Sequence, residues 1–251
     1  MRRITTTALL LTASLGVTGA ATAQTGGGWL VRAVVVQCHR AASDTDRFVV
    51  FAGRMRAIKG TARMSVKFDL LQRTATSAGF VAVDGGSSTG ESDPPAPTIY
   101  RYKAMFRNLT APALYKGRAT FSWLDASGKV IRQIQRTTGP CIQPDPRPNL
   151  VVGQVRSQKA GQGQRRYFAA IRNDGLGTAG SFDVALSVNG KALVPVTIAS
   201  LPARSRQVVS FVGPACGANG SLRITVDPDN RVAEGNEADD AKTVACPVQL
   251  G

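Results

Sequence analysis

Hydrophobic and polar residues alternate one by one along several stretches of the chain, the pattern of strands with one buried and one solvated face. The clearest stretches are residues 63–70, 100–107 and 118–123 in the first half, and 182–188 and 222–226 in the second. Helical periodicity is hard to find anywhere in the chain. The pattern therefore predicts an all-β protein of antiparallel sheets, packed as sandwiches of about seven strands each.

Turn-forming residues separate these stretches and predict how the strands connect. Asn189-Gly190 lies between two alternating runs and predicts a two-residue hairpin, and residues 125–128 predict a second hairpin. Residues 85–97 are rich in glycine, serine and proline, which predicts a long flexible loop.

The first 23 residues have the features of a secretory signal peptide. Arg2 and Arg3 precede an apolar stretch at residues 8–17, and Ala21-Thr22-Ala23 is a small-x-small cleavage pattern, so we expect cleavage before Gln24. The apolar stretch is shorter than the ~20 residues that span a bilayer. We expect an exported protein with no transmembrane segment after cleavage, either extracellular or held to the cell envelope non-covalently.

Three prolines in residues 144–148 predict a stiff linker, and we place a domain boundary there. The mature chain then has an N-terminal basic domain at residues 24–143 and a second domain at residues 149–251. We expect both to be immunoglobulin-like antiparallel β-sandwiches, arranged in tandem after the signal peptide (residues 1–23).

The four cysteines fit an oxidising compartment, where disulfides form and persist. Four cysteines allow three pairings. We favour Cys38–Cys141 and Cys216–Cys246, because each pair then lies inside one predicted domain. The chain has no CxxC motif and no cysteine–histidine spacing suited to zinc, and we expect no cofactor.

The positive charge is concentrated in the first domain. The whole chain carries a net charge of +15. Residues 24–148 contain 18 lysines and arginines against 8 acidic residues, whereas residues 149–251 contain 11 against 8. This asymmetry indicates either an anionic partner or a charge that serves solubility.

Six basic residues occupy the polar positions of predicted strands in the first domain, and these are the candidate binding residues: Arg63, Lys67, Arg101, Lys103, Arg107 and Arg118. If several share one sheet, they form a cationic surface for an anionic cell-wall polymer or an acidic glycan. We do not expect nucleic acid as the partner, because no aromatic stacking platform is interleaved with them. The alternative is a solvated sheet face with no ligand.

Residues 227–240, here called the acidic segment, crowd carboxylate and amide oxygens together, as calcium sites do. The EF-hand order fails, because Arg231 stands at the fifth position, Val232 at the sixth and Ala238 at the twelfth. The pattern favours a loop whose Asp and Asn side chains cap their own backbone. We therefore predict no metal site.

Catalytic patterns are missing from the sequence. The chain has one histidine, His39, beside a predicted disulfide cysteine, and it lacks a phosphate-binding glycine loop, an HExxH motif and a nucleophile elbow. We expect no enzymatic activity and no catalytic residues.

The second domain resembles a known family in four segments: Pro148–Val152, Ile171–Gly180, Leu201-Pro202-Ala203 and Val226–Asp240. In this order and spacing they are similar to CARDB, the cell-adhesion-related domain found in bacteria, over about residues 148–246. The resemblance implies an immunoglobulin-like sandwich in an exported or surface protein, with an adhesion or accessory role and no chemistry of its own. Where the family pattern usually ends in two asparagines, this chain has Asp239-Asp240, which makes the turn more acidic.

In the first domain, Tyr102, residues 108–112 and Tyr115 faintly resemble the strand–corner–strand pattern of fibronectin type III modules. Together these features predict a secreted, non-catalytic binding or adhesion module that associates with anionic envelope polymers or surface proteins. One alternative is a structural subunit of a surface assembly held by protein–protein contacts. Another is a divergent wall-polymer hydrolase, which would need a clustered carboxylate pair.

Overall fold

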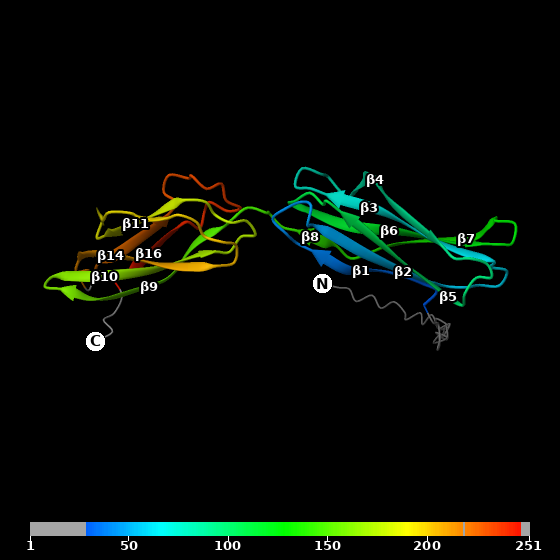
Figure 1. The fold of residues 1–251 in the computed structure, drawn as a ribbon, viewed down its shortest axis with the longest axis horizontal. Helices are drawn as coiled ribbons and strands as arrows, with labels where there is room; N and C mark the ends of the chain where they lie inside the picture. The colour runs from blue at the N-terminus through cyan, green and yellow to red at the C-terminus, as the bar shows by residue number, and fades with distance from the viewer. Residues whose placement is uncertain (1–28, 218, 247–251) are drawn as a thin grey trace, which may run out of the picture. The chain divides into compact units, whose positions relative to one another are not determined.

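The fold was obtained as a computed structural model, which describes residues 29–217 and 219–246. Sixteen strands and no helix occur in this part of the chain (Figure 1). All paired strands run antiparallel, and the all-β sandwich prediction is confirmed. The predicted signal peptide and its cleavage site lie outside the described residues.

The first sandwich is built from two sheets. One sheet has the strand order β1-β2-β5, formed by Val31–His39, Phe48–Arg56 and Ile99–Arg107. The other has the order β4-β3-β6-β7, with β8 also paired to β6; its strands in chain order are β3 (Arg63–Arg73), β4 (Val81–Glu91), β6 (Ala113–Leu124), β7 (Val130–Thr137) and β8 (Cys141–Gln143).

Strict alternation of buried and more exposed residues explains how the two sheets of this sandwich pack together. In β6 every second residue from Ala113 is buried, so that Phe121 and Trp123 point into the core with no exposed surface. Phe51 of the facing sheet packs there with its ring 5.7 Å from that of Phe68. The Trp123 indole nitrogen donates a 2.6 Å hydrogen bond to the carbonyl oxygen of Arg56, which satisfies the one polar atom of this buried ring.

The corner between β5 and β6 is closed by a tyrosine. The hydroxyl of Tyr115 donates a 3.0 Å hydrogen bond to the carbonyl oxygen of Thr110, five residues upstream. Asn108 adopts a left-handed conformation with φ of 56° at the start of this corner. A tyrosine hydroxyl that reaches back to the backbone at a strand corner is a recurrent feature of immunoglobulin-like sandwiches.

The prediction of a loop over residues 85–97 is wrong for its first half, since β4 continues to Glu91. Its glycines and serines pair with β3 through the backbone, which needs no large side chain. Gly90 gives room to the ring of Tyr102, because a Cβ at this position would stand 2.1 Å from Cδ2 of that ring. The Ser88 hydroxyl lies 2.6 Å from the Tyr102 hydroxyl and fixes the ring over the strand.

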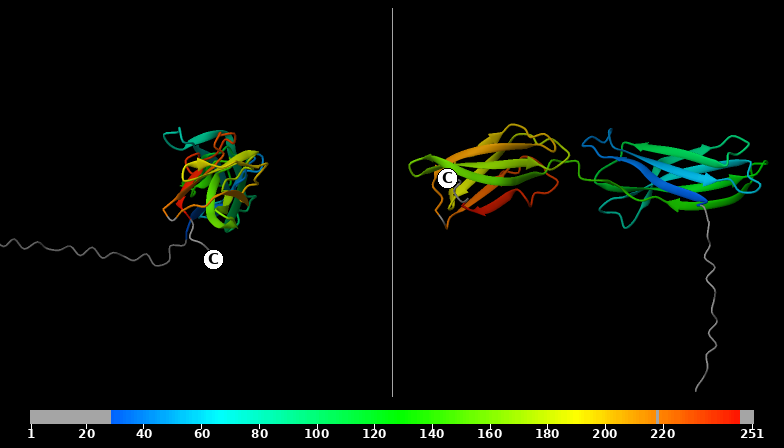
Figure 2. Two further views of the ribbon diagram at one scale, coloured as in Figure 1. Left: turned by 90° about the vertical axis from the view of Figure 1, so that its left-hand side faces the viewer. Right: turned by 90° about the horizontal axis from the view of Figure 1, so that it is seen from below.

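The second sandwich also has two sheets (Figure 2). One has the order β14-β10-β9, formed by Arg206–Pro214, Gln164–Asn173 and Leu150–Gly161. The other has the order β12-β11-β15-β16, with β13 also paired to β11; its strands are β11 (Phe182–Val188), β12 (Lys191–Ala192), β13 (Val196–Ile198), β15 (Ser221–Val226) and β16 (Ala241–Ala245).

Two predicted hairpins are present. Asn189 and Gly190 connect β11 to β12 with φ angles of 50° and 80°, the left-handed pair that a type I′ turn requires. Asp125 begins the turn between β6 and β7, where its Oδ1 accepts hydrogen bonds from the backbone N–H groups of Ser127 and Lys129 at 2.9 and 3.0 Å.

A buried asparagine organises one end of the second sandwich. Asn173 has no exposed surface. Its Oδ1 accepts hydrogen bonds from Asn149 N at 3.1 Å and Gly175 N at 3.0 Å. Its Nδ2 donates to the carbonyl oxygens of Gly177 at 2.8 Å and Leu201 at 3.0 Å. One amide thus joins the entry of β9 to two loops, with all its polar capacity used.

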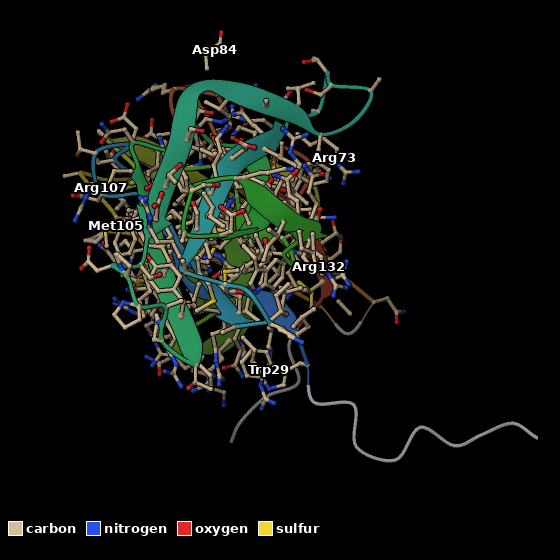
Figure 3. All side chains as sticks on the ribbon, turned by 90° about the vertical axis from the view of Figure 1, so that its right-hand side faces the viewer. Trp29, Arg73, Asp84, Met105, Arg107 and Arg132 are labelled. Carbon is tan, nitrogen blue, oxygen red and sulfur yellow. A yellow bond between two sulfur atoms is a disulfide. The ribbon has the colours of Figure 1, made fainter. Side chains whose placement is uncertain are left out.

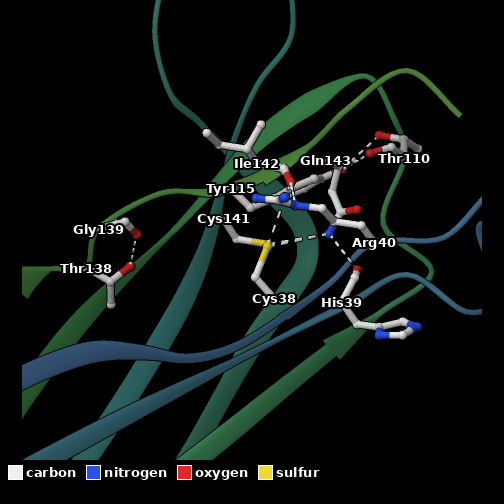
Figure 4. The surroundings of a disulfide bond; sticks show 10 residues. All are labelled: Cys38, His39, Arg40, Thr110, Tyr115, Thr138, Gly139, Cys141, Ile142 and Gln143. Carbon is white, nitrogen blue, oxygen red and sulfur yellow. Dashed lines mark hydrogen bonds between the residues drawn. A yellow bond between two sulfur atoms is a disulfide. The ribbon is translucent and has the colours of Figure 1, made fainter. Parts of the chain in front are cut away.

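Both predicted disulfides are confirmed. Cys38 at the end of β1 bonds to Cys141 at the start of β8 with a Cα–Cα distance of 5.5 Å (Figure 4). The Gln143 amide beside this bond donates to the carbonyl oxygen of His39 at 2.9 Å. Cys216 bonds to Cys246, so the chain before β15 is joined to the chain after β16.

Candidate binding surface

The six basic residues predicted to bind an anionic partner do not form one surface, because they belong to two different sheets. Three of them, Arg63, Lys67 and Arg118, lie on β3 and β6. The other three, Arg101, Lys103 and Arg107, lie on β5, which belongs to the sheet β1-β2-β5.

The three on β3 and β6 each have a carboxylate partner. Arg63 lies 3.2 Å from Glu91. Lys67 and Arg118 both approach Asp69, at 3.1 and 3.4 Å respectively. Exposed pairs of this kind add little stability. They do lower the positive charge that these three residues present to an anion, since two carboxylates offset part of three bases.

Asp69 holds its two cations because it stays ionised. Burial acts to raise the pKa of Asp69, but the Ser87 hydroxyl, which donates a 2.8 Å hydrogen bond, and the nearby Lys67 and Arg118 outweigh it. The net result is a pKa below the ordinary value of 3.8. The two neighbouring bases are therefore occupied throughout the neutral pH range.

The three on β5 share one outward face. Arg101, Lys103 and Arg107 are exposed, whereas Ala104 and Phe106 between them are buried. Met105 is on the same outward face, with 46% of its surface exposed, next to Arg107 (Figure 3). Strand β5 thus presents basic residues and one apolar side chain outward.

Strand register extends this cationic group across the whole sheet. Arg101 pairs with Arg54 of β2, and Arg54 pairs with Arg32 of β1, so three arginines form one row across three strands. We call these three together with Lys103 and Arg107 the arginine face. Directly opposed residues stand about 5 Å apart and like charges there repel. An anion bound along the row would reduce the repulsion between the neighbouring arginines.

No carboxylate is built into these strands. β1, β2 and β5, which the structure describes throughout, contain no aspartate or glutamate. This distinguishes the arginine face from the face of β3 and β6, where Asp69 and Glu91 neutralise the bases. The six candidate residues predicted from the sequence did not include Arg32, which stands in an otherwise apolar run, or Arg54.

An aromatic ring lies at the other end of this sheet. His39, Phe48 and Arg107 are paired in register across the three strands. The rings of His39 and Phe48 stack with centroids 5.0 Å apart, and the Arg107 guanidinium carbon lies 5.7 Å from the Phe48 centroid. The single histidine of the chain thus packs at a strand end. The cation–π contact restrains Arg107 on the face.

The acidic segment of the second sandwich divides into two parts. In the first part, Asp227 caps its own loop, since its two carboxylate oxygens accept from the backbone N–H groups of Arg231 at 3.1 Å and Val232 at 2.7 Å. The Arg231 guanidinium pairs with Asp229 at 2.7 Å and Asp183 at 3.2 Å. The predicted self-capping is confirmed for this part.

The second part holds carboxylates that are not compensated in this way. Glu234 accepts a hydrogen bond from the backbone N–H of Leu150, and its own backbone N–H donates to Glu237 at 2.8 Å. Burial raises the pKa of Glu234 to about 7. Burial, followed by the neighbouring carboxylates, raises the pKa of Asp240 to about 6.

The family model CARDB matches residues 147–244, which contain β9 to β15 and most of β16. This part of the chain is a CARDB domain. The four segments named above lie in it, and its last segment is the acidic segment. The resemblance predicted over about residues 148–246 is confirmed.

Two solved structures are similar to the CARDB domain. One is a domain of a putative cell surface protein from Methanosarcina acetivorans, 27% identical, covering 41% of this chain and 94% of that chain with a TM-score of 0.38. The other is a CARDB domain from Pyrococcus furiosus in complex with di-metal ions, 24% identical, covering 39% and 84% with a TM-score of 0.34.

The transglutaminase of red sea bream is similar over more of the chain. It is 10% identical and covers 87% of this chain and 31% of its own, with a TM-score of 0.36. No curated protein matches the chain. Within the described residues, no helix is long and apolar enough to cross a membrane.

Proposed function

We propose that this chain is an exported, non-catalytic binding module that holds an anionic polymer of the cell envelope on the arginine face. The CARDB domain supports a surface or adhesion-type role of the bacterial kind. The two disulfides, with all four described cysteines paired, suit an oxidising compartment outside the cytoplasm.

One observation carries the choice of ligand. Arg32, Arg54 and Arg101 stand in one row on three strands that contain no acidic residue. Neighbouring strands are about 4.8 Å apart, so the row spans about 10 Å. That length suits two or more successive acidic groups of a polymer better than a single small anion. The exposed Met105, between Lys103 and Arg107 on the same face of β5, offers apolar contact to a polymer backbone.

This proposal narrows the predicted site. Arg101, Lys103 and Arg107 bind the anion together with Arg32, whereas Arg63, Lys67 and Arg118 are engaged with carboxylates and contribute little. The chain therefore contains its own matched control. Two triple variants remove the same charge, one from each sheet of the same sandwich.

The test is co-sedimentation of the purified protein with purified bacterial cell-wall material at low and at high salt. Binding driven by charge weakens steeply with salt. At about 1 kcal/mol per basic residue near an anionic surface, R101Q/K103Q/R107Q is expected to weaken binding by about a hundredfold. The control R63Q/K67Q/R118Q is expected to weaken it by about twofold, because those bases are already paired.

Two outcomes would count against this function. Binding that persists at high salt and in the R101Q/K103Q/R107Q variant would indicate a protein–protein contact, as in a structural subunit of a surface assembly. The absence of binding at either salt would remove the envelope polymer as the ligand.

A further inference from the structure

We propose that Glu234, Glu237 and Asp240 of the CARDB domain form a binding site for a calcium ion. One carboxylate oxygen from each of the three residues lies within 4.8 Å of the oxygens from the other two. This site departs from the sequence prediction of no metal. It does not depend on the arginine face, which belongs to the other sandwich.

Buried oxygens without partners are the observation that points to a ligand. Glu234 is 1% exposed and Asp240 is 7% exposed. Glu234 Oε1 and Asp240 Oδ1 are inaccessible and accept no hydrogen bond from any described residue. A buried carboxylate oxygen without a hydrogen bond or counter-charge is unfavourable. A cation bound between Glu234 Oε1 and Asp240 Oδ1 would satisfy both oxygens at once.

No basic side chain of the described residues forms a salt bridge with these three carboxylates, although Arg147 is near enough to Glu237 to interact with it electrostatically. The nearby bases are engaged elsewhere: Arg147 pairs with the aspartate two residues before it, Arg231 pairs with Asp229, and Lys242 donates to the carbonyl oxygen of Gly153.

The spacing fits calcium. Calcium takes 6–8 oxygen ligands at about 2.3–2.6 Å, so two oxygens on opposite sides of one ion stand at most about 5 Å apart. The three carboxylates already converge within that limit. Glu237 is exposed, which leaves one side of the site open for water molecules to complete the shell.

A bound ion would join the two sheets of the domain. Glu234 accepts from the backbone N–H of Leu150, the first residue of β9. The carbonyl oxygen of Asp240 accepts from the N–H of Val226, the last residue of β15, at 2.9 Å. Since β9 and β15 belong to different sheets, calcium here stabilises the domain across its core.

The test is differential scanning calorimetry of the purified full chain, first treated with EDTA and then titrated with calcium chloride. Calcium at a hundredfold excess over its dissociation constant is expected to raise the unfolding midpoint of one transition by about 10 °C. Isothermal titration is expected to show one ion bound per chain.

Two variants make the test specific. Asp240→Asn is expected to weaken calcium affinity at least about tenfold, since even outer partners of a metal site are worth that much. Its amide N–H can donate to Glu234, so the EDTA-treated variant is expected to melt above the EDTA-treated wild type. Asp229→Asn removes an exposed carboxylate from the same segment and is expected to respond to calcium like the wild type.

Two results would overturn the site. If calcium leaves the wild-type midpoint unchanged, the two buried carboxylates share a proton instead of a metal ion. If Asp240→Asn responds to calcium as fully as the wild type does, the ion binds elsewhere on the surface.

Discussion

The ring of Tyr102 lies against the backbone of Gly90, where any Cβ would stand 2.1 Å from Cδ2 of that ring. Gly90→Ala must therefore push the ring away and break its 2.6 Å contact with Ser88. We expect a loss of about 1–3 kcal/mol in the free energy of unfolding of the first sandwich, as for other overpacked sites. Urea unfolding followed by the fluorescence of the buried Trp123 measures it.

Gly139→Ala is the matched control for this substitution. A Cβ at Gly139 would meet no atom within 4 Å. Its unfolding free energy is expected to stay within about 0.5 kcal/mol of the wild type. Equal effects of the two substitutions would show that close contact with Tyr102 does not explain Gly90.

Asn173 is expected to be a sensitive position of the CARDB domain. Asn173→Ala leaves two backbone N–H groups and the Gly177 carbonyl oxygen without their partner, whereas the Leu201 carbonyl oxygen keeps its 3.0 Å bond from Ala179 N. Each unsatisfied group costs about 1–3 kcal/mol, so a loss of about 4 kcal/mol or more is expected. Calorimetry of the variant measures it. The exposed Asn236 serves as the control, and comparable losses at both positions would contradict this role.

Acid should abolish the contribution of Asp69. Its pKa in the folded state lies below the ordinary 3.8, so its stabilising effect is present above that value and is lost as the pH falls through the folded pKa. Asp69→Asn is therefore expected to lower stability by up to about 1 kcal/mol at pH 7.

The measurement for Asp69 is the urea midpoint of wild type and variant at neutral pH and below the folded pKa, where the two should coincide. The exposed Asp84→Asn variant controls for the loss of one charge from the same sheet. A difference between Asp69→Asn and wild type that persists in acid would show that the effect is not one of ionisation.

The two disulfides should differ in their contribution to stability. Cys38–Cys141 closes a sequence separation of 103 and Cys216–Cys246 one of 30. In the chain-entropy model these loops give about 5 and about 4 kcal/mol respectively. Paired Cys→Ser variants, compared by chemical unfolding, are expected to show the larger loss for the first pair. The reverse order would show that contacts around the bonds outweigh loop entropy.

The alternation of hydrophobic and polar residues predicts those strands best that have one buried face and one more exposed face. β3, β6 and β11 alternate almost perfectly between buried and more exposed positions, and their sequences show it. The later part of β4, residues 85–91, has the sequence of a loop because its pairing rests on backbone hydrogen bonds and on glycine beside Tyr102, neither of which produces a periodic pattern. The local sequence around Gly90 does not show that this position must be glycine, because the constraint comes from the Tyr102 ring on another strand.

The candidate sites were harder to predict, because they depend on which strands become neighbours. Arg101 and Arg118 have the same polar position in similar strands, yet one faces Arg54 and the other pairs with Asp69. The sequence shows only that the acidic segment contains many carboxylate and amide side chains. Only burial and hydrogen bonding separate Asp227, whose oxygens are satisfied, from Asp240, whose Oδ1 is not.

The Cys38–Cys141 bond determines how the first sandwich responds to a pulling force. Tension applied at the two ends of this sandwich passes from β1 through the sulfur atoms to β8 and bypasses the strands between them. The shielded segment, about 3.4 Å per residue when extended, represents roughly 350 Å of chain that force cannot unravel while the bond is oxidised. In the CARDB domain the bond shields only β15 and β16, so β9 to β14 would lengthen first.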